Sequence, residues 1–104
     1  MKNLIKRHQA ATWERGMITP ETGMIDFMLK LDEEYDELRN EFADMVDQDL
    51  TVPTKAMTHE LVDLCAVAIN CMSFYGIDFI SEYRKNVLHQ ESRVINIDSK
   101  QGNL

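Results

Sequence analysis

The chain has 104 residues, of which 44% are hydrophobic, and a net charge of −7 at pH 7, which fits one folded domain with a modest core. The acidic balance argues against a nucleic-acid duplex as partner, because phosphate backbones select basic surfaces. No apolar run is long enough to cross a bilayer and no signal-peptide core follows Met1, so we expect a cytoplasmic protein with no membrane partner.

The first half of the chain predicts two helices. Residues 3–15 form a short polar helix that Gly16 ends. Thr19-Pro20-Glu21 has the signature of a helix start, with a capping hydroxyl, a proline in the first turn and an acid near the positive end. The helix that follows carries an apolar stripe and fades near residues 47–49. The stripe consists of Met24, Met28, Leu31, Tyr35, Leu38, Phe42 and Met45, at steps of three and four.

The second half predicts two more helices and no convincing strand. A turn with Pro53 leads into the most apolar helix, residues 55–75, which Gly76 ends as a left-handed cap. The fourth helix runs over residues 78–89. After Arg93 the period is lost, and residues 94–97 are at best an ordered extension or a short strand. We therefore expect an all-α four-helix bundle, one domain over 1–104 with its core at 19–93 and a tail at 94–104.

The second helix carries the acidic segment Glu33-Glu34-Tyr35-Asp36-Glu37. Residues three apart lie on nearly the same side of a helix, so Glu34 and Glu37 project together. With Leu31 at the centre of the apolar stripe, they fall about 60° and 120° to one side, while Glu33 lies toward solvent. Alternatively, the acids from Glu33 to Glu41 only form the solvent-exposed face of an amphipathic helix.

The third helix carries the second acidic pair, Glu60 and Asp63, also three residues apart. Asp63 lies inside a nearly unbroken apolar block, where we expect burial on most sides. A buried carboxylate costs several kcal/mol unless it is paired or bound to a metal. Either Asp63 pairs with Arg39 or Arg15 from another helix, or the two acidic pairs meet around a cation. Four carboxylates, those of Glu34, Glu37, Glu60 and Asp63, suit Mg²⁺ or Mn²⁺.

These residues resemble a known family. Glu33-Glu34-x-x-Glu37, followed after 22 intervening residues by Glu60-x-x-Asp63, is similar to the EExxE…ExxD signature of the MazG-like, all-α nucleoside triphosphate pyrophosphohydrolases. The flanks agree, with Lys30-Leu31-Asp32 before the first motif and Gly76-Ile77-Asp78 after the third helix. The resemblance spans residues 24–93, and it implies the four-helix arrangement of that family.

The resemblance also implies a reaction. Such enzymes hydrolyse a nucleoside triphosphate between the α- and β-phosphates and release a monophosphate and pyrophosphate. By analogy, Glu34, Glu37, Glu60 and Asp63 would hold Mg²⁺, or Mn²⁺ in its place. Glu33 would assist the metal shell or the attacking water, so the resemblance makes Glu33 and Glu34 the catalytic residues. Relatives place basic and amide residues on the fourth helix to meet the phosphates, and Lys85, Asn86 and Arg93 stand there in this chain. Ordinary surface charge is the alternative for Lys85 and Arg93.

Two further residues are candidates for binding the nucleotide. Asn70 follows Asp63 by two turns on a similar line, so it either reaches the ligand above the metal or is a satisfied core amide. Trp13 on the first helix, with His8 beside it, either stacks on the base or belongs to the core or an interface. Core packing is the commoner fate of such residues.

Three other kinds of protein are alternatives to this functional prediction. A di-iron bundle requires Glu-x-x-His motifs, which neither acidic pair provides. A phosphoribosyl-ATP pyrophosphohydrolase shares the helices and the metal. A helical interaction protein would use its acids only as a solvated face. The chain has seven methionines and a nearly all-apolar third helix, and a 12.1 kDa chain cannot bury that much hydrophobic surface alone. We therefore expect a homodimer or homotetramer with the third and fourth helices near the interface.

Overall fold

The computed structural model describes the backbone of residues 1–100 and the side chains of residues 1–94. This part of the chain contains four helices and no strand, which confirms the predicted all-α fold. The helices are α1 (Lys2–Glu14), α2 (Met24–Asp47), α3 (Lys55–Phe74) and α4 (Phe79–Lys100).

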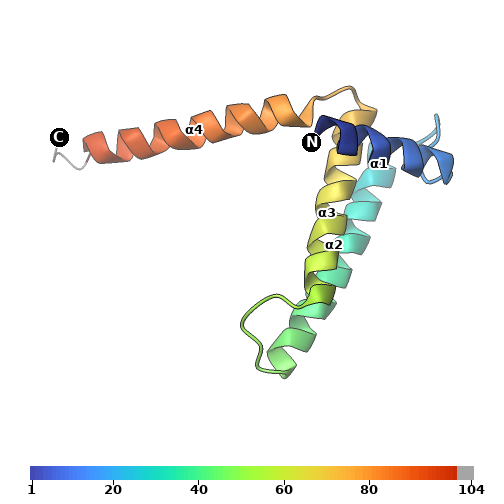
Figure 1. Cartoon of the computed structure of the whole chain (residues 1–104), viewed down its shortest axis with the longest axis horizontal. Coiled ribbons are helices and arrows are strands. Elements are labelled where there is room, and N and C mark those ends of the chain that lie inside the picture. The colour runs from blue at the N-terminus through green and yellow to red at the C-terminus, as the bar shows by residue number, and fades with distance from the viewer. Residues whose placement is uncertain (101–104) are drawn as a thin grey trace.

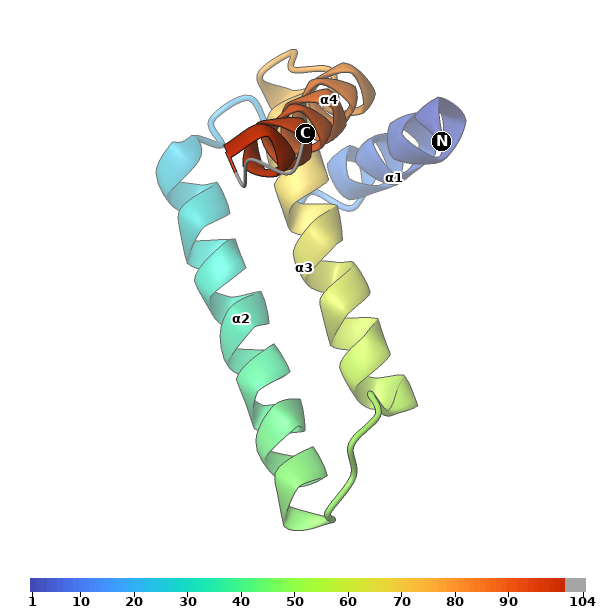
Figure 2. The ribbon, with the colours of Figure 1, turned by 90° about the vertical axis from the view of Figure 1, so that its left-hand side faces the viewer.

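The helices α2 and α3 form an antiparallel hairpin, and α1 and α4 meet it at one end. Figure 1 shows α1 lying across the end of α3 at which α4 begins, while α4 points away from the hairpin. The view in Figure 2 shows that α2 and α3 run side by side over most of their length. The chain bends by 112° between α3 and α4, so α4 does not pack along the hairpin.

The ends of α3 lie where the sequence predicts them. Thr54 caps the start, because its hydroxyl accepts a hydrogen bond from the Met57 N–H at 3.1 Å. At the other end Gly76 has φ +72°, and the Ile77 N–H donates to the Met72 carbonyl at 2.8 Å. This is a Schellman cap, in which glycine adopts a left-handed conformation that other residues adopt at a cost.

Two predicted boundaries are wrong. Helix α2 begins at Met24 and not at Thr19, because local hydrogen bonds hold residues 19–22 as a turn: the Thr19 hydroxyl accepts from the Glu21 N–H, and the Thr19 N–H donates to the Thr22 hydroxyl. Helix α4 continues to Lys100, past the predicted end near His89 and through the segment predicted as an extension or strand. No glycine or proline interrupts residues 79–100, so nothing stops the helix there. Residues 101–104 of the predicted tail lie outside the described residues.

The chain buries little of its hydrophobic surface. Among the described side chains, only Ile18, Phe27 and Met45 are buried hydrophobic residues. The predicted burial of α3 on most sides is wrong for the single chain, since Asn70 is its only buried side chain and Val62 is 60% exposed. The radius of gyration is 18.0 Å, whereas a compact domain of this length has about 13 Å. The reason is the outward course of α4, which leaves much of α3 without a covering element.

The predicted apolar stripe of α2 is only partly buried. Phe27, Glu34 and Met45 are the buried residues of this helix, and they lie on one line at helical spacing. Met24, Met28, Tyr35 and Phe42 from the predicted stripe remain about half exposed. The buried face of α2 is therefore rotated about the helix axis relative to the predicted one. Glu34 lies on the buried face, and part of the apolar stripe has no neighbouring element.

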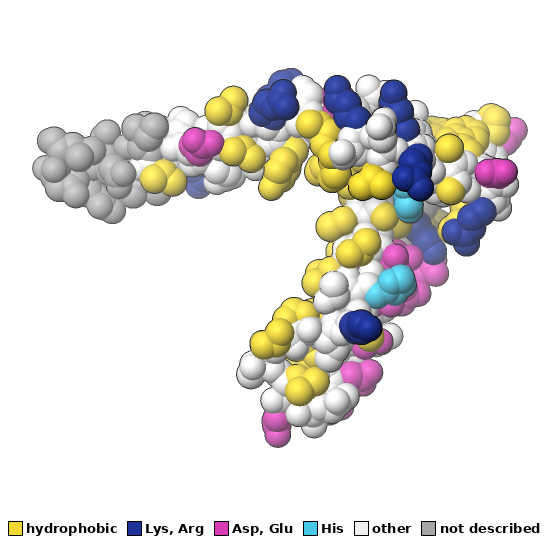
Figure 3. Space-filling model, viewed as in Figure 1, with side chains coloured by type: hydrophobic (Ala, Val, Ile, Leu, Met, Phe, Trp, Pro, Cys, Tyr) yellow, Lys and Arg dark blue, Asp and Glu magenta, His cyan; other side chains and the backbone are white. Residues whose placement is uncertain are grey.

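The surface divides along the hairpin. Figure 3 shows hydrophobic side chains gathered on α4 and on the side of the hairpin that faces the inside of the bend, whereas acidic and histidine side chains lie on the opposite side of the hairpin. In the described part of the chain, no single helix is long and apolar enough to cross a membrane. Only α3 and residues Phe79–Val94 of α4 reach that length and composition, and they do so together as a pair bent by 112°.

Candidate metal centre

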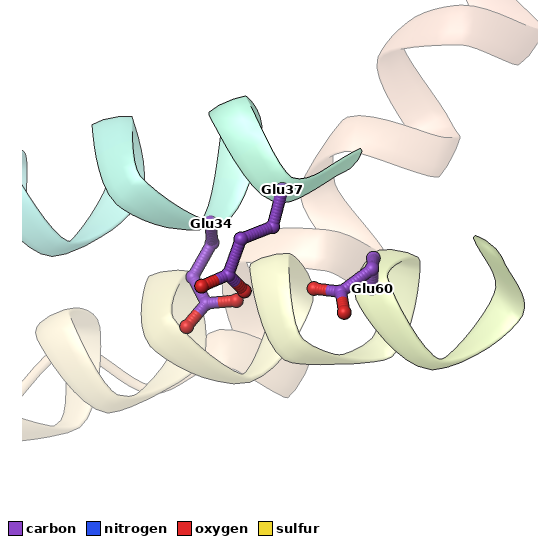
Figure 4. Close-up of side chains that lie close together, drawn as sticks. All are labelled: Glu34, Glu37 and Glu60. Atoms are coloured by element: carbon purple, nitrogen blue, oxygen red, sulfur yellow. The ribbon is translucent and has the colours of Figure 1, made fainter. Parts of the chain in front are cut away.

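Three glutamates converge between the two helices of the hairpin. Glu34 and Glu37 come from α2 and Glu60 comes from α3, and each offers a carboxylate oxygen within 4.8 Å of the others. Figure 4 shows the Glu34 and Glu37 side chains together on α2, with the Glu60 carboxylate turned toward them from α3. The spacing of three residues on α2 and the antiparallel partner helix produce this convergence.

The three carboxylates differ in burial. The Glu34 residue is only 6% exposed, Glu60 is half-buried and Glu37 is exposed. One buried oxygen of Glu34 and one of Glu60 (Oε2 in both) have no hydrogen-bond partner among the described residues. A buried acceptor without a partner costs about 1–3 kcal/mol, and a charged one costs more. A bound ion or a water molecule is a common partner of such oxygens.

The electrostatics of the cluster oppose full ionisation. Burial raises the pKa of Glu34, repulsion from Glu37 and Asp63 acts in the same direction, and the Lys30 ammonium acts against them. The pKa of Glu37 is raised first by Glu60, to which the protonated Glu37 carboxyl can donate a hydrogen bond, and then by burial and by repulsion from Glu60. Both shifts mean that negative charge on the cluster is costly without a cation.

Asp63, the fourth predicted ligand, lies beside the cluster and outside it. Its Oδ2 is 3.3 Å from His59 Nε2, and its side chain is 37% exposed, so the predicted burial is wrong. Neither Arg39 nor Arg15 forms the predicted pair with Asp63 among the described residues. Arg39 pairs with Asp36 at 2.6 Å, and the partner of Asp63 is His59 in its own helix. Asp63 is still close enough to Glu34 to raise its pKa. Its role as a metal ligand stays a prediction.

A cavity of about 520 Å³ adjoins the cluster. It lies between α1, the segment that joins α1 to α2, and the hairpin, and Glu34 and Asp63 both line it. Arg15 and Lys30 also line the cavity and bring positive charge to it. The volume lies within the range of small-molecule sites, about 300–1,000 Å³. The cavity therefore offers space for an organic ligand directly beside the carboxylates.

Asn70 lies in the wall of this cavity and is fixed by α1. The residue is 5% exposed, its Oδ1 is 3.1 Å from His8 Nδ1, and its Nδ2 donates to the Thr12 hydroxyl at 3.2 Å. Asn70 is therefore a hydrogen-bonded buried amide, and it also lines the cavity. The sequence leaves a core amide and a ligand-binding residue as alternatives. These bonds tie α1 to α3, so they help to form the cavity.

Trp13 is placed elsewhere. Its ring stacks on Phe74 with 5.9 Å between the ring centroids, it is 38% exposed, and it does not line the cavity beside the cluster. The packing role that the sequence allows for this residue is therefore present in the structure. A contact between Trp13 and a base stays a prediction.

The remaining predicted site residues lie outside the cluster. Glu33 is on the solvent side of α2, with its side chain 59% exposed and its Oε1 3.4 Å from Lys30 Nζ. Lys85, Asn86 and Arg93 are exposed on α4, which points away from the hairpin, and Lys85 pairs with Glu82 at 3.3 Å. Within one chain these three residues cannot meet a ligand held by the glutamates.

Two residues near the cluster were not assigned a role from the sequence. Lys30 lies 3.3 Å from Glu34 Oε1, and His59 lies 3.3 Å from Asp63. Each stands four residues before its acid, and residues four apart are neighbours on a helix. That spacing is the signal that could have found them.

A divalent cation fits the donors that the structure brings together. Three carboxylates of mixed burial, two of them with an unpartnered buried oxygen, match the hard oxygen ligands that Mg²⁺ and Mn²⁺ prefer. Comparison with models of known protein families, with curated proteins and with solved structures gives no match for this chain. The function must therefore be argued from the site itself.

Proposed function

We propose that this protein is a Mg²⁺- or Mn²⁺-dependent hydrolase that converts a nucleoside triphosphate to the monophosphate and pyrophosphate, as the MazG-like all-α enzymes do. The observation that carries the proposal is the convergence of Glu34, Glu37 and Glu60, with unpartnered buried oxygens, beside a cavity of about 520 Å³. The two acidic motifs that resemble that family supply these same residues.

In this proposal the glutamates of both helices hold the cation. Glu34, Glu37 and Glu60 are its ligands, and Asp63 completes the set after leaving His59. When bound, the ion supplies neutralising charge for the phosphate oxygens and activates water. Glu33, which is exposed beside Lys30, is available to orient the attacking water. The hairpin supplies the rigid backbone that keeps the ligands at fixed spacing.

The cavity is the place for the nucleoside in this proposal. The buried amide of Asn70 is held by His8 and Thr12, so its remaining hydrogen-bonding capacity has a fixed direction. A fixed polar group in the wall of a pocket is the kind of feature that orients a ligand. Arg15 and Lys30, which also line this cavity, provide positive charge in it.

The positions of Lys85, Asn86 and Arg93 lead to the assembly that we propose. Because α4 points away from the hairpin of its own chain, these residues reach phosphates only at the site of another copy. A homodimer or homotetramer would place the apolar surface inside the bend between α3 and α4 against a second chain. The exposed side chains of Val62 and Leu88, 60% and 61%, then become interface residues.

The test is a panel of canonical and modified nucleoside triphosphates, with phosphoribosyl-ATP alongside, incubated with Mg²⁺ and resolved by chromatography. We expect a monophosphate and pyrophosphate in equal amounts from at least one of them. Glu34→Gln and Asp63→Asn should each lower turnover at least about 100-fold, because loss of a group that only orients a metal ligand already costs about 10–100-fold. Asp44→Asn, at an exposed acid of the same helix, is the matched control and should keep full activity.

Two outcomes would contradict the proposal. The first is turnover by the wild-type protein that persists in a chelator, because the site then does not need its cation. The second is full turnover in both Glu34→Gln and Asp63→Asn. Turnover of phosphoribosyl-ATP alone would keep the metal site and change the substrate.

A further inference from the structure

Lys30 is the cation nearest to the glutamate cluster. Its Nζ lies 3.3 Å from Glu34 Oε1 and 3.4 Å from Glu33 Oε1. Among the side chains of residues 1–94, it is the only cationic group within ion-pair distance of Glu34, Glu37 or Glu60. The Glu34 side chain is 8% exposed and that of Lys30 is 34% exposed, so the pair lies at the border between the cluster and solvent.

The pair satisfies only part of the cluster. Lys30 contacts one oxygen of Glu34, while the buried Oε2 of the same carboxylate has no partner and belongs to the group that faces Glu37 and Glu60. When all three carboxylates are ionised, one ammonium leaves two negative charges uncompensated. That is the charge of one divalent ion, so Lys30 can hold Glu34 in place without neutralising the site.

The Lys30–Glu34 pair is also easy to break. Lysine stands four residues before glutamate, which is the less favourable order on a helix, because the reverse order agrees with the helix dipole. The lysine end of the pair is 34% exposed, and pairs that water reaches contribute only about 0.2–1 kcal/mol. The lysine side chain is long and flexible and carries a compact charge that can move without disturbing the helix. A divalent cation therefore meets little resistance from this pair.

We propose that Lys30 is an exchangeable counter-ion of the cluster. In the metal-free protein its ammonium holds Glu34. When Glu34 binds a divalent cation, the ammonium turns from Glu34 into the adjoining cavity, which Lys30 already lines, and is then available to an anionic group of the ligand. This assigns Lys30 as a phosphate-binding residue that becomes free only when the metal site is filled. The inference depends on the metal site of the proposed function, and it does not depend on turnover.

The first test observes Lys30 directly in the full-length wild-type protein. The lysine side chains are labelled with ¹³C and ¹⁵N, and the Lys30 Cε and Nζ resonances are followed by NMR while Mg²⁺ is added in the absence of nucleotide. We expect these resonances to shift until the site is saturated and to shift again when inorganic pyrophosphate is added. Lys2, an exposed lysine at the start of α1 that does not line the cavity, is the internal control and should not respond to Mg²⁺.

The second test measures the competition. Calorimetric titration with Mn²⁺ should show tighter binding to Lys30→Gln than to the wild-type protein, by up to about fivefold, because removing the pair removes its contribution of up to about 1 kcal/mol. Glutamine can still donate a hydrogen bond to Glu34, which keeps the variant folded. Pyrophosphate should bind more weakly to the Mn²⁺-loaded variant than to the loaded wild type. Lys2→Gln, at an exposed lysine at the start of α1 that does not line the cavity, should match the wild type in both titrations.

The outcomes separate the two proposals. Mn²⁺ binding by the wild type, with no movement of the Lys30 resonances and no gain in affinity for Lys30→Gln, overturns the exchange and leaves the metal site standing. Absence of Mn²⁺ and Mg²⁺ binding by the wild type overturns both. Binding, with movement of Lys30, supports the exchange even where no nucleotide is hydrolysed.

Discussion

At the scale of single residues, Glu34 connects the stability of the protein with its proposed function. One of its oxygens is paired with Lys30, and the other is buried without a partner among the described residues. A side chain in this position is costly in the metal-free protein and favourable once a cation is bound. The stability of the chain should therefore depend on the metal and on the proton, since either one can remove the negative charge.

The pH dependence of stability follows from the raised pKa values of Glu34 and Glu37. Between the ordinary value of 4.5 and the raised values, the folded state binds more protons than the unfolded state. Lowering the pH from 7.5 to 5 in the presence of a chelator should therefore raise the urea concentration at the unfolding midpoint. With saturating Mg²⁺ the carboxylates stay ionised and bound, so this rise should disappear.

The variant Glu60→Gln is the control for this effect. It removes the group that most raises the pKa of Glu37, so the increase in the unfolding midpoint on acidification should be smaller than in the wild type. A midpoint that falls steadily from pH 7.5 to 5 in the metal-free wild type would contradict the expectation. It would mean that the cluster is not strained by its own charge.

The candidate residues were only partly predictable at this scale. Helical spacing is enough to place Glu34 and Glu37 on one side of α2, and the structure confirms that Glu60 approaches them. The exposure of Asp63 was not predictable, because an apolar stretch indicates burial only when another element covers it, and α4 does not cover α3. His59 was overlooked although its spacing from Asp63 places the two side chains together.

At the scale of helices, the cap at Gly76 sets the direction in which α4 leaves α3. A Cβ at this position would meet no atom within 4 Å, so the cost of a side chain arises from the backbone alone, with φ +72°. We expect Gly76→Ala to lower the free energy of unfolding by about 1 kcal/mol. Urea denaturation followed by circular dichroism measures the change.

The matched variant is Gly76→Asn. Asparagine tolerates the left-handed region better than alanine, so its effect should be clearly smaller. Equal stabilities for the wild type and Gly76→Ala would show that the chain does not need this conformation, and that the bend between α3 and α4 is not fixed by the cap.

The helix boundaries show which local signals the sequence carries. The caps at Thr54 and Gly76 were predictable because each needs only its own few residues. The start of α2 was misplaced because Thr19 and Thr22 use their hydroxyls within a turn, and the competing signal is the Asp26 carboxylate, which accepts from the Gly23 N–H at 2.8 Å. The length of α4 was underestimated because a weak apolar period was taken as its end.

At the scale of the whole molecule, the chain has more apolar surface than it can cover. Four of the seven residues in the predicted stripe of α2 and a row of apolar residues on α4 are exposed, the latter including Tyr83, Val87 and Leu88. The sequence predicts such a surplus from composition, but it does not specify where a partner lies, because helix periods define faces and not the angles between helices. The outward course of α4 is the feature that the sequence did not indicate.

Assembly is therefore the prediction at this scale. We expect sedimentation at micromolar concentration to give a dimer or tetramer and not a 12.1 kDa monomer. Leu88→Asp should shift the protein toward monomers, because it places a charge in an apolar interface on α4. Ser92→Asp adds the same charge at an exposed polar position of that helix and should leave the assembly unchanged. A wild-type monomer, or equal behaviour of the two variants, would contradict the proposed interface.

The most direct measurement of the central claim is anomalous diffraction from crystals of the full-length protein grown with Mn²⁺. We predict a strong anomalous peak between α2 and α3, within coordination distance of the Glu34, Glu37 and Glu60 carboxylates, and its loss in Glu34→Gln. Crystals of the wild type at saturating Mn²⁺ with no peak at these three residues, and with the two unpartnered oxygens hydrogen-bonded to protein groups instead, would contradict the metal site.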